Sequence, residues 1–194
     1  MEEAPYGFAS RKLAMWIFII ADASAFGAML FAYGYVRVAS PDWSRPFEFS
    51  PTILSGLIMT ALLLGGSLAI LRAFRDAKEG NRGGAARWLG ITALLGLLFT
   101  GLHIREWAGM LAAGWRPAVN PLGGSVLFGA SYFGITGLEL LHVVVGVCAV
   151  FVVALKYRAG RLTPGHVETT GLYWHFVNLV WMFVFPLVYL LNTR

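Results

Sequence analysis

Long apolar stretches separated by short polar segments dominate the pattern of this chain. A helix needs roughly 20 apolar residues to cross a hydrocarbon core of about 30 Å. Stretches of this kind with few charges lie at about residues 13–37, 52–74, 87–110, 125–155 and 171–192. The sequence therefore predicts an all-α, polytopic membrane protein, with five transmembrane helices in a single domain over residues 1–194.

The composition supports a membrane protein and excludes several functional classes. Hydrophobic residues make up 58% of the chain and charged residues 13%, whereas a soluble domain is about a quarter charged. The lone Cys148 excludes a disulfide framework and a cysteine-ligated cluster. No Walker loop, nucleotide fingerprint or nucleophile elbow occurs, so nothing indicates hydrolysis or phosphoryl transfer.

The basic residues are distributed unevenly over the two predicted membrane faces. Of the 15 Lys and Arg residues, the face of the N-terminus holds Arg11, Lys12, Arg72, Arg75, Lys78, Arg82, Arg87, Lys156, Arg158 and Arg161, and the other holds Arg37, Arg45, Arg105, Arg116 and Arg194. The positive-inside rule predicts a cytoplasmic N-terminus and a periplasmic C-terminus in a bacterial inner membrane. Anionic lipid headgroups, not nucleic acid, are then the partners expected for this charge.

Tryptophans lie near the predicted ends of the spans. An amphipathic ring is favoured at a membrane–water interface. We therefore expect an aromatic belt, not a cofactor site, from Trp16, Trp43, Trp88, Trp107, Trp115 and Trp174.

Asp22 lies well inside the first predicted span, in the sequence IIADAS. A carboxylate at this depth costs at least a few kcal/mol unless it is paired, neutralised or facing water. Its apolar neighbours make a role in holding a proton chemically available. A structural acid bonded to a neighbouring helix is the equal alternative.

Glu139 and His142 lie three residues apart in the fourth span, so they share one side of that helix. The imidazole can share a proton or a hydrogen bond with the buried acid. Di-iron carboxylate bundles use the same spacing, but they need the motif twice and two further acids. The other pair at this spacing is the reversed His103 and Glu106, at a different depth, which disfavours the di-iron alternative.

Three other polar positions near the span ends have simpler expected roles. Glu106, beside Arg105, is expected to snorkel toward water or to pair with its neighbours. His175 enters the fifth span from the cytoplasmic side and is expected to be structural, with a lipid headgroup, a carboxylate or a partner subunit as its candidate partners. Asn178, one turn deeper, offers an amide for hydrogen bonding between helices.

Taken together, five segments resemble subunit III of haem-copper oxidases. They are LAMWIFIIAD at 13–22, WLGIT at 88–92, LLFTGLHIRE at 97–106, LHVVVG at 141–146 and YWHFVNLVW at 173–181. They occur in the family's order and cover nearly all of the chain, and the last, which ends in Trp181, is quite specific. The resemblance implies the family's five-span form, which lacks the first two spans of the seven-span form and has its N-terminus in the cytoplasm.

The resemblance also implies a role. The chain would be a non-catalytic accessory subunit of a respiratory terminal oxidase that reduces oxygen to water and translocates protons. It would support proton uptake and stability, pack on subunit I beside subunit II, and in some assemblies meet a small subunit IV or a larger supercomplex. Phospholipid would bind in a cleft between the family's first two helices and the rest.

No redox cofactor is expected in this chain, because family members leave haem and copper to partner subunits. The four His residues are also too few for a haem-copper site with its low-spin haem. No catalytic residue and no metal ligand is therefore expected. The proton-related or structural candidates are Asp22, Glu139, His142 and Glu106, and the candidates for lipid or subunit contact are His103, Trp174, His175, Asn178 and Trp181.

The chain departs from the family's usual pattern at buried polar positions. Asp22 stands where Glu is usual, Glu139 where many members have His, and Asn178 where mitochondrial members have Asp. The alternatives to an oxidase subunit are an accessory subunit of a nitric oxide reductase system and a membrane di-iron enzyme. A small transporter is less favoured, since neither repeats nor interrupted spans are found.

Overall fold

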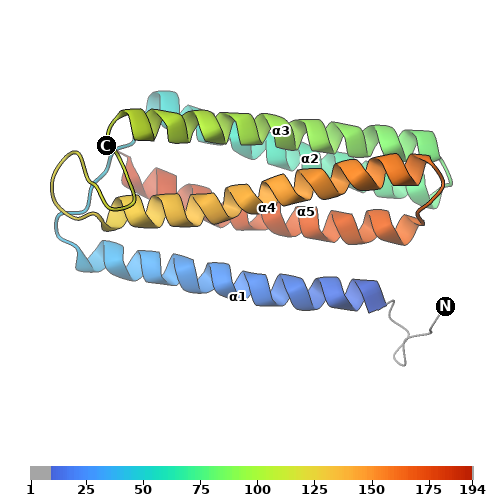
Figure 1. Cartoon of the computed structure of the whole chain (residues 1–194), viewed down its shortest axis with the longest axis horizontal. Helices are drawn as coiled ribbons and strands as arrows, with labels where there is room; N and C mark the ends of the chain where they lie inside the picture. The colour runs from blue at the N-terminus through green and yellow to red at the C-terminus, as the bar shows by residue number, and fades with distance from the viewer. Residues whose placement is uncertain (1–9, 194) are drawn as a thin grey trace.

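The chain folds into five long helices in a computed structural model that describes residues 10–193 (Figure 1). Each is long and apolar enough to cross a membrane, which confirms the five predicted spans. Arg194 and residues 1–9 lie outside the described residues. The elements are α1 (Ser10–Ala39), η1 (Phe49–Ile53), α2 (Leu54–Lys78), α3 (Arg82–Ala112), α4 (Leu127–Arg158), α5 (Pro164–Val184), η2 (Phe185–Tyr189) and η3 (Leu190–Asn192).

The helix ends carry recognisable capping residues. The Asn81 side chain accepts a hydrogen bond from the Gly84 N–H at 2.9 Å and caps α3. Gly80 and Gly160, with φ of 78° and 75°, make the left-handed turns that end α2 and α4. Helix α5 begins before the predicted residue 171, because Thr163 caps it and polar residues continue the helix.

Two helical hairpins, α2–α3 and α4–α5, pack together, and α1 lies along their outside. Helix α2 contacts α3 and α5, and α4 contacts α3 and α5, while α1 packs on α4 and α5 (Figure 1). Only Phe26 and Tyr33 of α1 are buried. Most of the surface of α1 therefore remains free to meet lipid or another protein.

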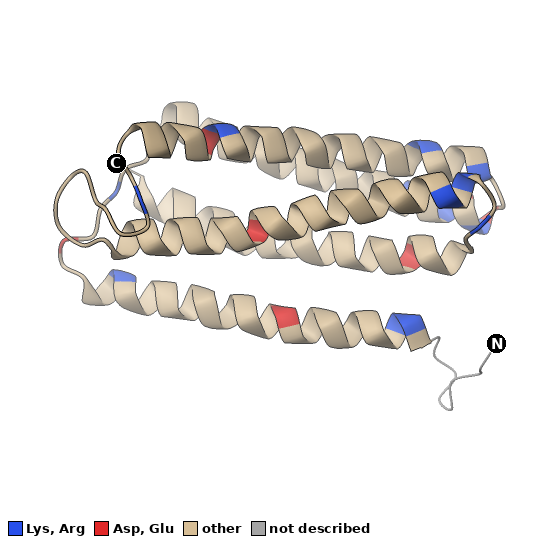
Figure 2. Ribbon diagram, in the orientation of Figure 1, with Lys and Arg blue, Asp and Glu red and all other residues tan. Residues whose placement is uncertain are grey.

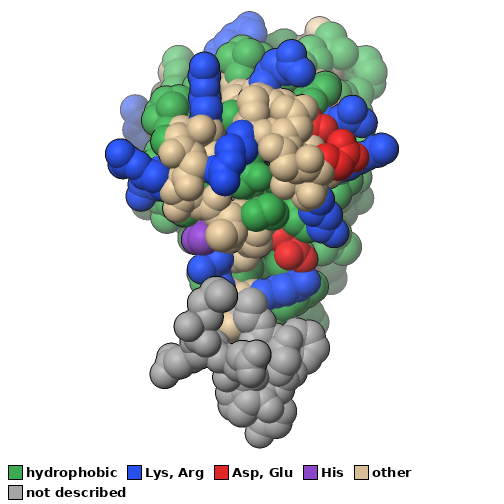
Figure 3. Space-filling model, turned by 90° about the vertical axis from the view of Figure 1, so that its right-hand side faces the viewer, with side chains coloured by type: hydrophobic (Ala, Val, Ile, Leu, Met, Phe, Trp, Pro, Cys, Tyr) green, Lys and Arg blue, Asp and Glu red, His purple; other side chains and the backbone are tan. Residues whose placement is uncertain are grey.

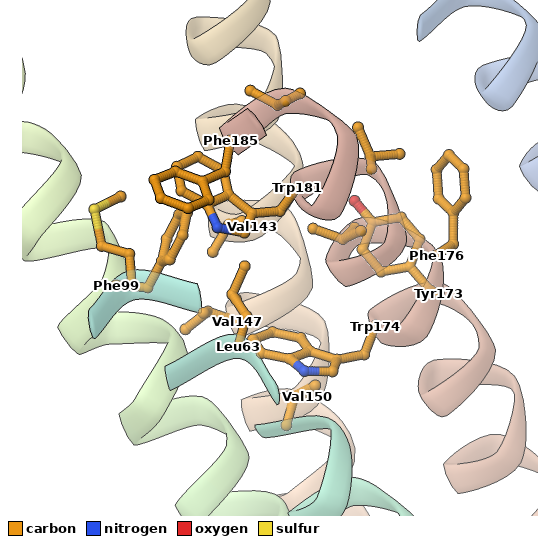
Figure 4. Packing of buried hydrophobic residues seen from close by; sticks show 14 of the residues in the cluster. Leu63, Phe99, Val143, Val147, Val150, Tyr173, Trp174, Phe176, Trp181 and Phe185 are labelled. Atoms are coloured by element: carbon orange, nitrogen blue, oxygen red, sulfur yellow. The ribbon is translucent and has the colours of Figure 1, made fainter. Parts of the chain in front are cut away.

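Trp174 of α5 fills the centre of the four-helix body. Its side chain is 1% exposed and lies beside Leu63, Val147 and Val150 (Figure 4). A Cβ added at Gly66 of α2, Gly96 of α3 or Gly146 of α4 would meet its indole ring. Small residues on three helices thus let the backbones approach around one large side chain, as is typical of membrane bundles.

Hydrogen bonds also connect the packed helices. The Trp181 indole donates to the Thr60 hydroxyl at 2.9 Å, and the Asn178 amide donates to the Ser67 hydroxyl at 3.1 Å. Both bonds join α5 to α2. The prediction that Asn178 bonds between helices is confirmed.

The aromatic belt prediction is wrong for two tryptophans. Trp174 and Trp115 are 1% and 3% exposed, so neither ring lies at a lipid-facing surface. Trp174 enters the core because glycines on the facing helices leave room for its ring. Proximity to the end of an apolar run does not reveal such a space.

The two ends of the bundle differ in charge. Basic side chains gather at the end that holds the α2–α3 and α4–α5 turns and the start of α1 (Figure 2). Figure 3 looks onto this end and shows Lys and Arg side chains around its rim with few acidic ones. The opposite end, which holds the α1–α2 and α3–α4 loops, has fewer basic residues.

Replacing Gly96 by Ala tests the space around Trp174. The new Cβ would lie 2.6 Å from Trp174 Cη2, and overpacking of this kind costs about 1–3 kcal/mol. Gly90→Ala on the same helix is the matched control, because its Cβ would meet nothing within 4 Å. In detergent, thermal unfolding of the purified protein is expected at lower temperature for Gly96→Ala alone; equal behaviour of the two variants would contradict this packing.

Candidate functional site

Asp22 of α1 and His142 of α4 meet in the middle of the membrane-spanning region. The distance between Asp22 Oδ2 and His142 Nε2 is 3.1 Å, and the side chains are 17% and 13% exposed. Both residues lie near the midpoints of their helices, and acidic positions are sparse there (Figure 2). The structure thus joins two predicted polar candidates that are 120 residues apart.

The contact made by the other ring nitrogen of His142, Nδ1, shows where the imidazole carries a hydrogen. Nδ1 lies 2.8 Å from the Leu138 carbonyl oxygen. Since a carbonyl oxygen only accepts, Nδ1 carries a hydrogen and donates it. One further proton can then lie between Nε2 and Asp22, either on the carboxyl or on the imidazole. Either arrangement leaves the pair without net charge, which lowers its cost at bilayer depth.

Aromatic side chains lie beside this pair. The Tyr173 hydroxyl donates to the His142 backbone carbonyl at 3.0 Å. The Phe26 ring packs edge-on against the imidazole, with centroids 5.3 Å apart. Phe18 approaches Tyr173 with centroids 5.9 Å apart. The aromatic rings reduce access of lipid and water to the acid–imidazole contact.

Glu139 lies one turn before His142 but points into the bundle. It is fully buried, and neither carboxyl oxygen has a hydrogen-bond partner. Asp22 and Tyr173 are within electrostatic range. The described residues show no hydrogen bond between Glu139 and His142, so the imidazole pairs with the acid of another helix instead of the acid on its own.

A second polar group includes Glu106, near the C-terminal end of α3. The Glu106 carboxyl oxygens are buried and lie close to the Tyr189 hydroxyl, which in turn lies close to the Tyr132 hydroxyl. The prediction that Glu106 snorkels toward water is therefore wrong. The inward turn has a physical cause: Glu106 lies on the side of α3 that faces these two tyrosines, not the side that faces the membrane.

The remaining predicted residues take different positions. His103, Trp174 and Trp181 are 0%, 1% and 0% exposed, and their surroundings are this chain's own helices. His175 is partly exposed. That these residues or Asn178 contact lipid or a partner subunit stays a prediction.

Sequence reasoning missed the contacts that hold the two ends of α1. At one end, the Lys12 ammonium lies 2.6 Å from the Glu168 carboxylate of α5. At the other end, the buried Asn192 donates to the Tyr33 hydroxyl at 2.6 Å and accepts from the Trp43 indole at 2.8 Å. An asparagine within the apolar run YLLN was the available signal.

The described part of the chain holds no set of side chains placed to bind a metal ion. Across residues 10–193, no group of three or more His, Cys, Asp or Glu side chains is placed to hold an ion. Glu139 and His142 thus lack the further acids that a di-iron centre requires.

Comparisons with known proteins identify the family. The family model for cytochrome c oxidase subunit III matches residues 7–193. Subunit 3 of the cytochrome bo(3) ubiquinol oxidase of Pseudomonas aeruginosa is 30% identical, over 92% of this chain and 83% of the relative. Subunit 3 of the cytochrome c oxidase of Alkalihalophilus pseudofirmus is 28% identical, over 95% and 88%.

A third relative is a larger protein. The haem-copper oxidase subunit I+III of Aeropyrum pernix is 29% identical over 98% of this chain, which corresponds to 24% of the relative. Together, the five apolar helices, the buried polar pair and a family match over nearly the whole length lead to one conclusion: this chain belongs to the cytochrome c oxidase subunit III family.

Proposed function

We propose that this chain, as an accessory subunit of a haem-copper terminal oxidase, packs on subunit I through α1 and supports proton uptake through Asp22 and His142. The Asp22–His142 contact carries the proposal, because it joins the loosely packed α1 to the bundle through groups that can hold a proton. The complex would lie in a bacterial inner membrane, with haem and copper in subunits I and II and with bound phospholipid.

The exposed side of α1 suits a close contact with another helix. Ala21, Ala25, Ala28 and Ala32 recur at helical spacing and are exposed. Small residues at such spacing allow transmembrane helices to approach closely. The name of the Aeropyrum pernix relative combines subunits I and III, which supports subunit I as the partner of this side.

A bulky residue at Ala25 should separate the chain from subunit I. Ala25→Phe is expected to reduce the haem that co-purifies with the tagged chain, because the ring holds the two helices apart. Ala61→Phe is the matched control, since Ala61 is also exposed and lies near the middle of the α2 span. Equal haem recovery from both variants would exclude this side of α1 as the contact.

The acid–imidazole pair supports proton supply by its chemistry. It lies near mid-membrane, has aromatic rings beside it, and shares one proton between its two groups with no net charge. A proton that it passes on leaves one negative charge on Asp22 until another proton replaces it. We propose that it keeps a proton available near the surface that meets subunit I. The electron donor, cytochrome c or quinol, would bind elsewhere in the complex.

Substitutions at Asp22 separate proton holding from helix packing. Asp22→Asn keeps the size and a polar side chain but holds no titratable proton, whereas Asp22→Glu keeps the acid. We expect Asp22→Asn and Asp22→Ala to lower oxygen consumption or the lifetime of turnover of the purified complex, and Asp22→Glu to stay near wild type. Only Asp22→Ala should also weaken α1 packing, by about 1 kcal/mol.

Ser24→Ala is the control for this series, because the Ser24 hydroxyl bonds only its own helix, at Ile20 O. Unchanged turnover, lifetime and lipid content in Asp22→Ala would refute the proposed role of the pair.

The orientation proposed from charge places the basic end in the cytoplasm. The turns between α2 and α3 and between α4 and α5 would then face the cytoplasm, and the α1–α2 and α3–α4 loops the periplasm (Figure 1).

Thiol labelling tests this orientation. In a Cys148→Ala background, Leu122→Cys in the α3–α4 loop should react with an impermeant maleimide on intact cells. Gly83→Cys at the start of α3 should react only after lysis. The reverse pattern would overturn the orientation.

The relatives favour an oxidase over a nitric oxide reductase system. Each of the three relatives described above is an oxidase subunit by name, and one is from a ubiquinol oxidase and another from a cytochrome c oxidase.

A further inference from the structure

His175 lies near the middle of the fifth span. The apolar pattern predicts a span that begins at about residue 171 and places His175 near its edge, but the helical segment runs from Pro164 to Asn192. His175 is three residues from the midpoint of this segment, residue 178, which corresponds to about 4.5 Å along the helix axis. The imidazole is therefore deep in the apolar layer, at the level of the Asp22–His142 pair.

His175 has no partner in its own chain. Within residues 10–193 it forms no hydrogen bond, ion pair or ring contact, and it is partly exposed. A neutral imidazole carries one donor nitrogen and one acceptor nitrogen. Lipid chains offer neither a donor nor an acceptor, so unpaired polar groups are costly among them. The imidazole thus requires a partner from outside this chain.

The depth of His175 decides between the candidate partners. Headgroups lie about 15 Å from the middle of a hydrocarbon core that is about 30 Å thick. Lys and Arg reach the interface through long stems, and an imidazole on a single methylene is too short to do so. A polar side chain on another transmembrane helix can meet the imidazole at this depth.

The face of α5 that holds His175 is not covered by the described helices of the chain. Leu179 and Met182, four and seven residues further on, share this face and are 56% and 43% exposed. Leu179 also borders a groove of about 240 Å³ between α1 and α5. A cavity of about 150 Å³ holds benzene, so the groove has room for a large apolar side chain.

This surface differs from the side of α1 proposed to meet subunit I. Gly27 lines the groove from α1, and no atom lies within 4 Å of a Cβ added there. Ala25, on the side proposed for subunit I, is two residues away. Two residues correspond to about 200° of rotation about a helix axis, so the two surfaces lie on nearly opposite sides of α1.

We propose that His175, Leu179 and Met182, with the adjoining groove, dock a transmembrane helix of a subunit other than subunit I. That helix presents a hydroxyl, amide or carboxyl side chain to the imidazole, since each of these can pair with one of the ring nitrogens. An apolar side chain of the same helix enters the groove. The inference rests on the proposed function in one respect, that the chain works within a larger complex.

Photo-crosslinking in the purified complex tests the docking surface. Benzoylphenylalanine in place of Leu179 should crosslink to a transmembrane peptide of another subunit, identified by mass spectrometry and bearing a hydrogen-bonding side chain. The matched control is benzoylphenylalanine in place of Leu97, which is 57% exposed at the middle of α3. Position 97 should give lipid adducts only. From position 179, crosslinks to lipid alone, to subunit I or to a second copy of this chain would each overturn the proposal.

Substitutions at His175 test the imidazole itself. His175→Leu removes the hydrogen bond but suits lipid, so the crosslinked subunit should co-purify with the tagged chain in an amount about threefold to tenfold lower. His175→Gln keeps a donor and an acceptor and should retain most of that subunit. Equal recovery from wild type and both variants would overturn the role of His175. Haem content in the same samples reports the contact with subunit I separately, so failure of one proposal is distinguishable from failure of the other.

Discussion

Polar contacts at three depths hold α1 against the other helices. In a bilayer, apolar side chains gain little by leaving lipid for protein, so hydrogen bonds and close packing determine which helices associate. Lys12 and Glu168, Asp22 and His142, and Tyr33 and Asn192 provide such contacts from one end of α1 to the other. The position of α1, and with it the surface proposed to meet subunit I, depends on these few pairs.

The four remaining helices associate differently. Trp174 occupies a space that glycines on α2, α3 and α4 leave open, and Trp181 bonds Thr60 across the bundle. Dispersion contacts of a large ring with three backbones replace the hydrophobic driving force available in water. Helix α1, with two buried residues, has much less of its surface inside the bundle than these four helices have.

The spans were predictable from sequence because a membrane imposes one minimum length on every apolar helix. The contacts between spans were not. Local spacing favours Glu139 as the partner of His142, yet the acid that reaches the imidazole is Asp22 on a distant helix. Likewise, Glu106 looked like an interfacial charge because its sequence neighbours are Arg105 and Trp107, while the tyrosines that it faces come from α4 and η2. Such pairings depend on how helices rotate against one another, and apolar periodicity in a lipid-exposed span does not encode that rotation.

The bond from His142 Nδ1 to the Leu138 carbonyl limits how the imidazole handles protons. A histidine that conducts protons accepts one on one nitrogen and releases another from the opposite nitrogen. Here one nitrogen is occupied by its own helix, so a proton must arrive and depart through Nε2, on the side of Asp22. In the proposed role, the pair would therefore hold a proton beside a conducting route and would not be a link within it, because a single nitrogen both receives and releases the proton.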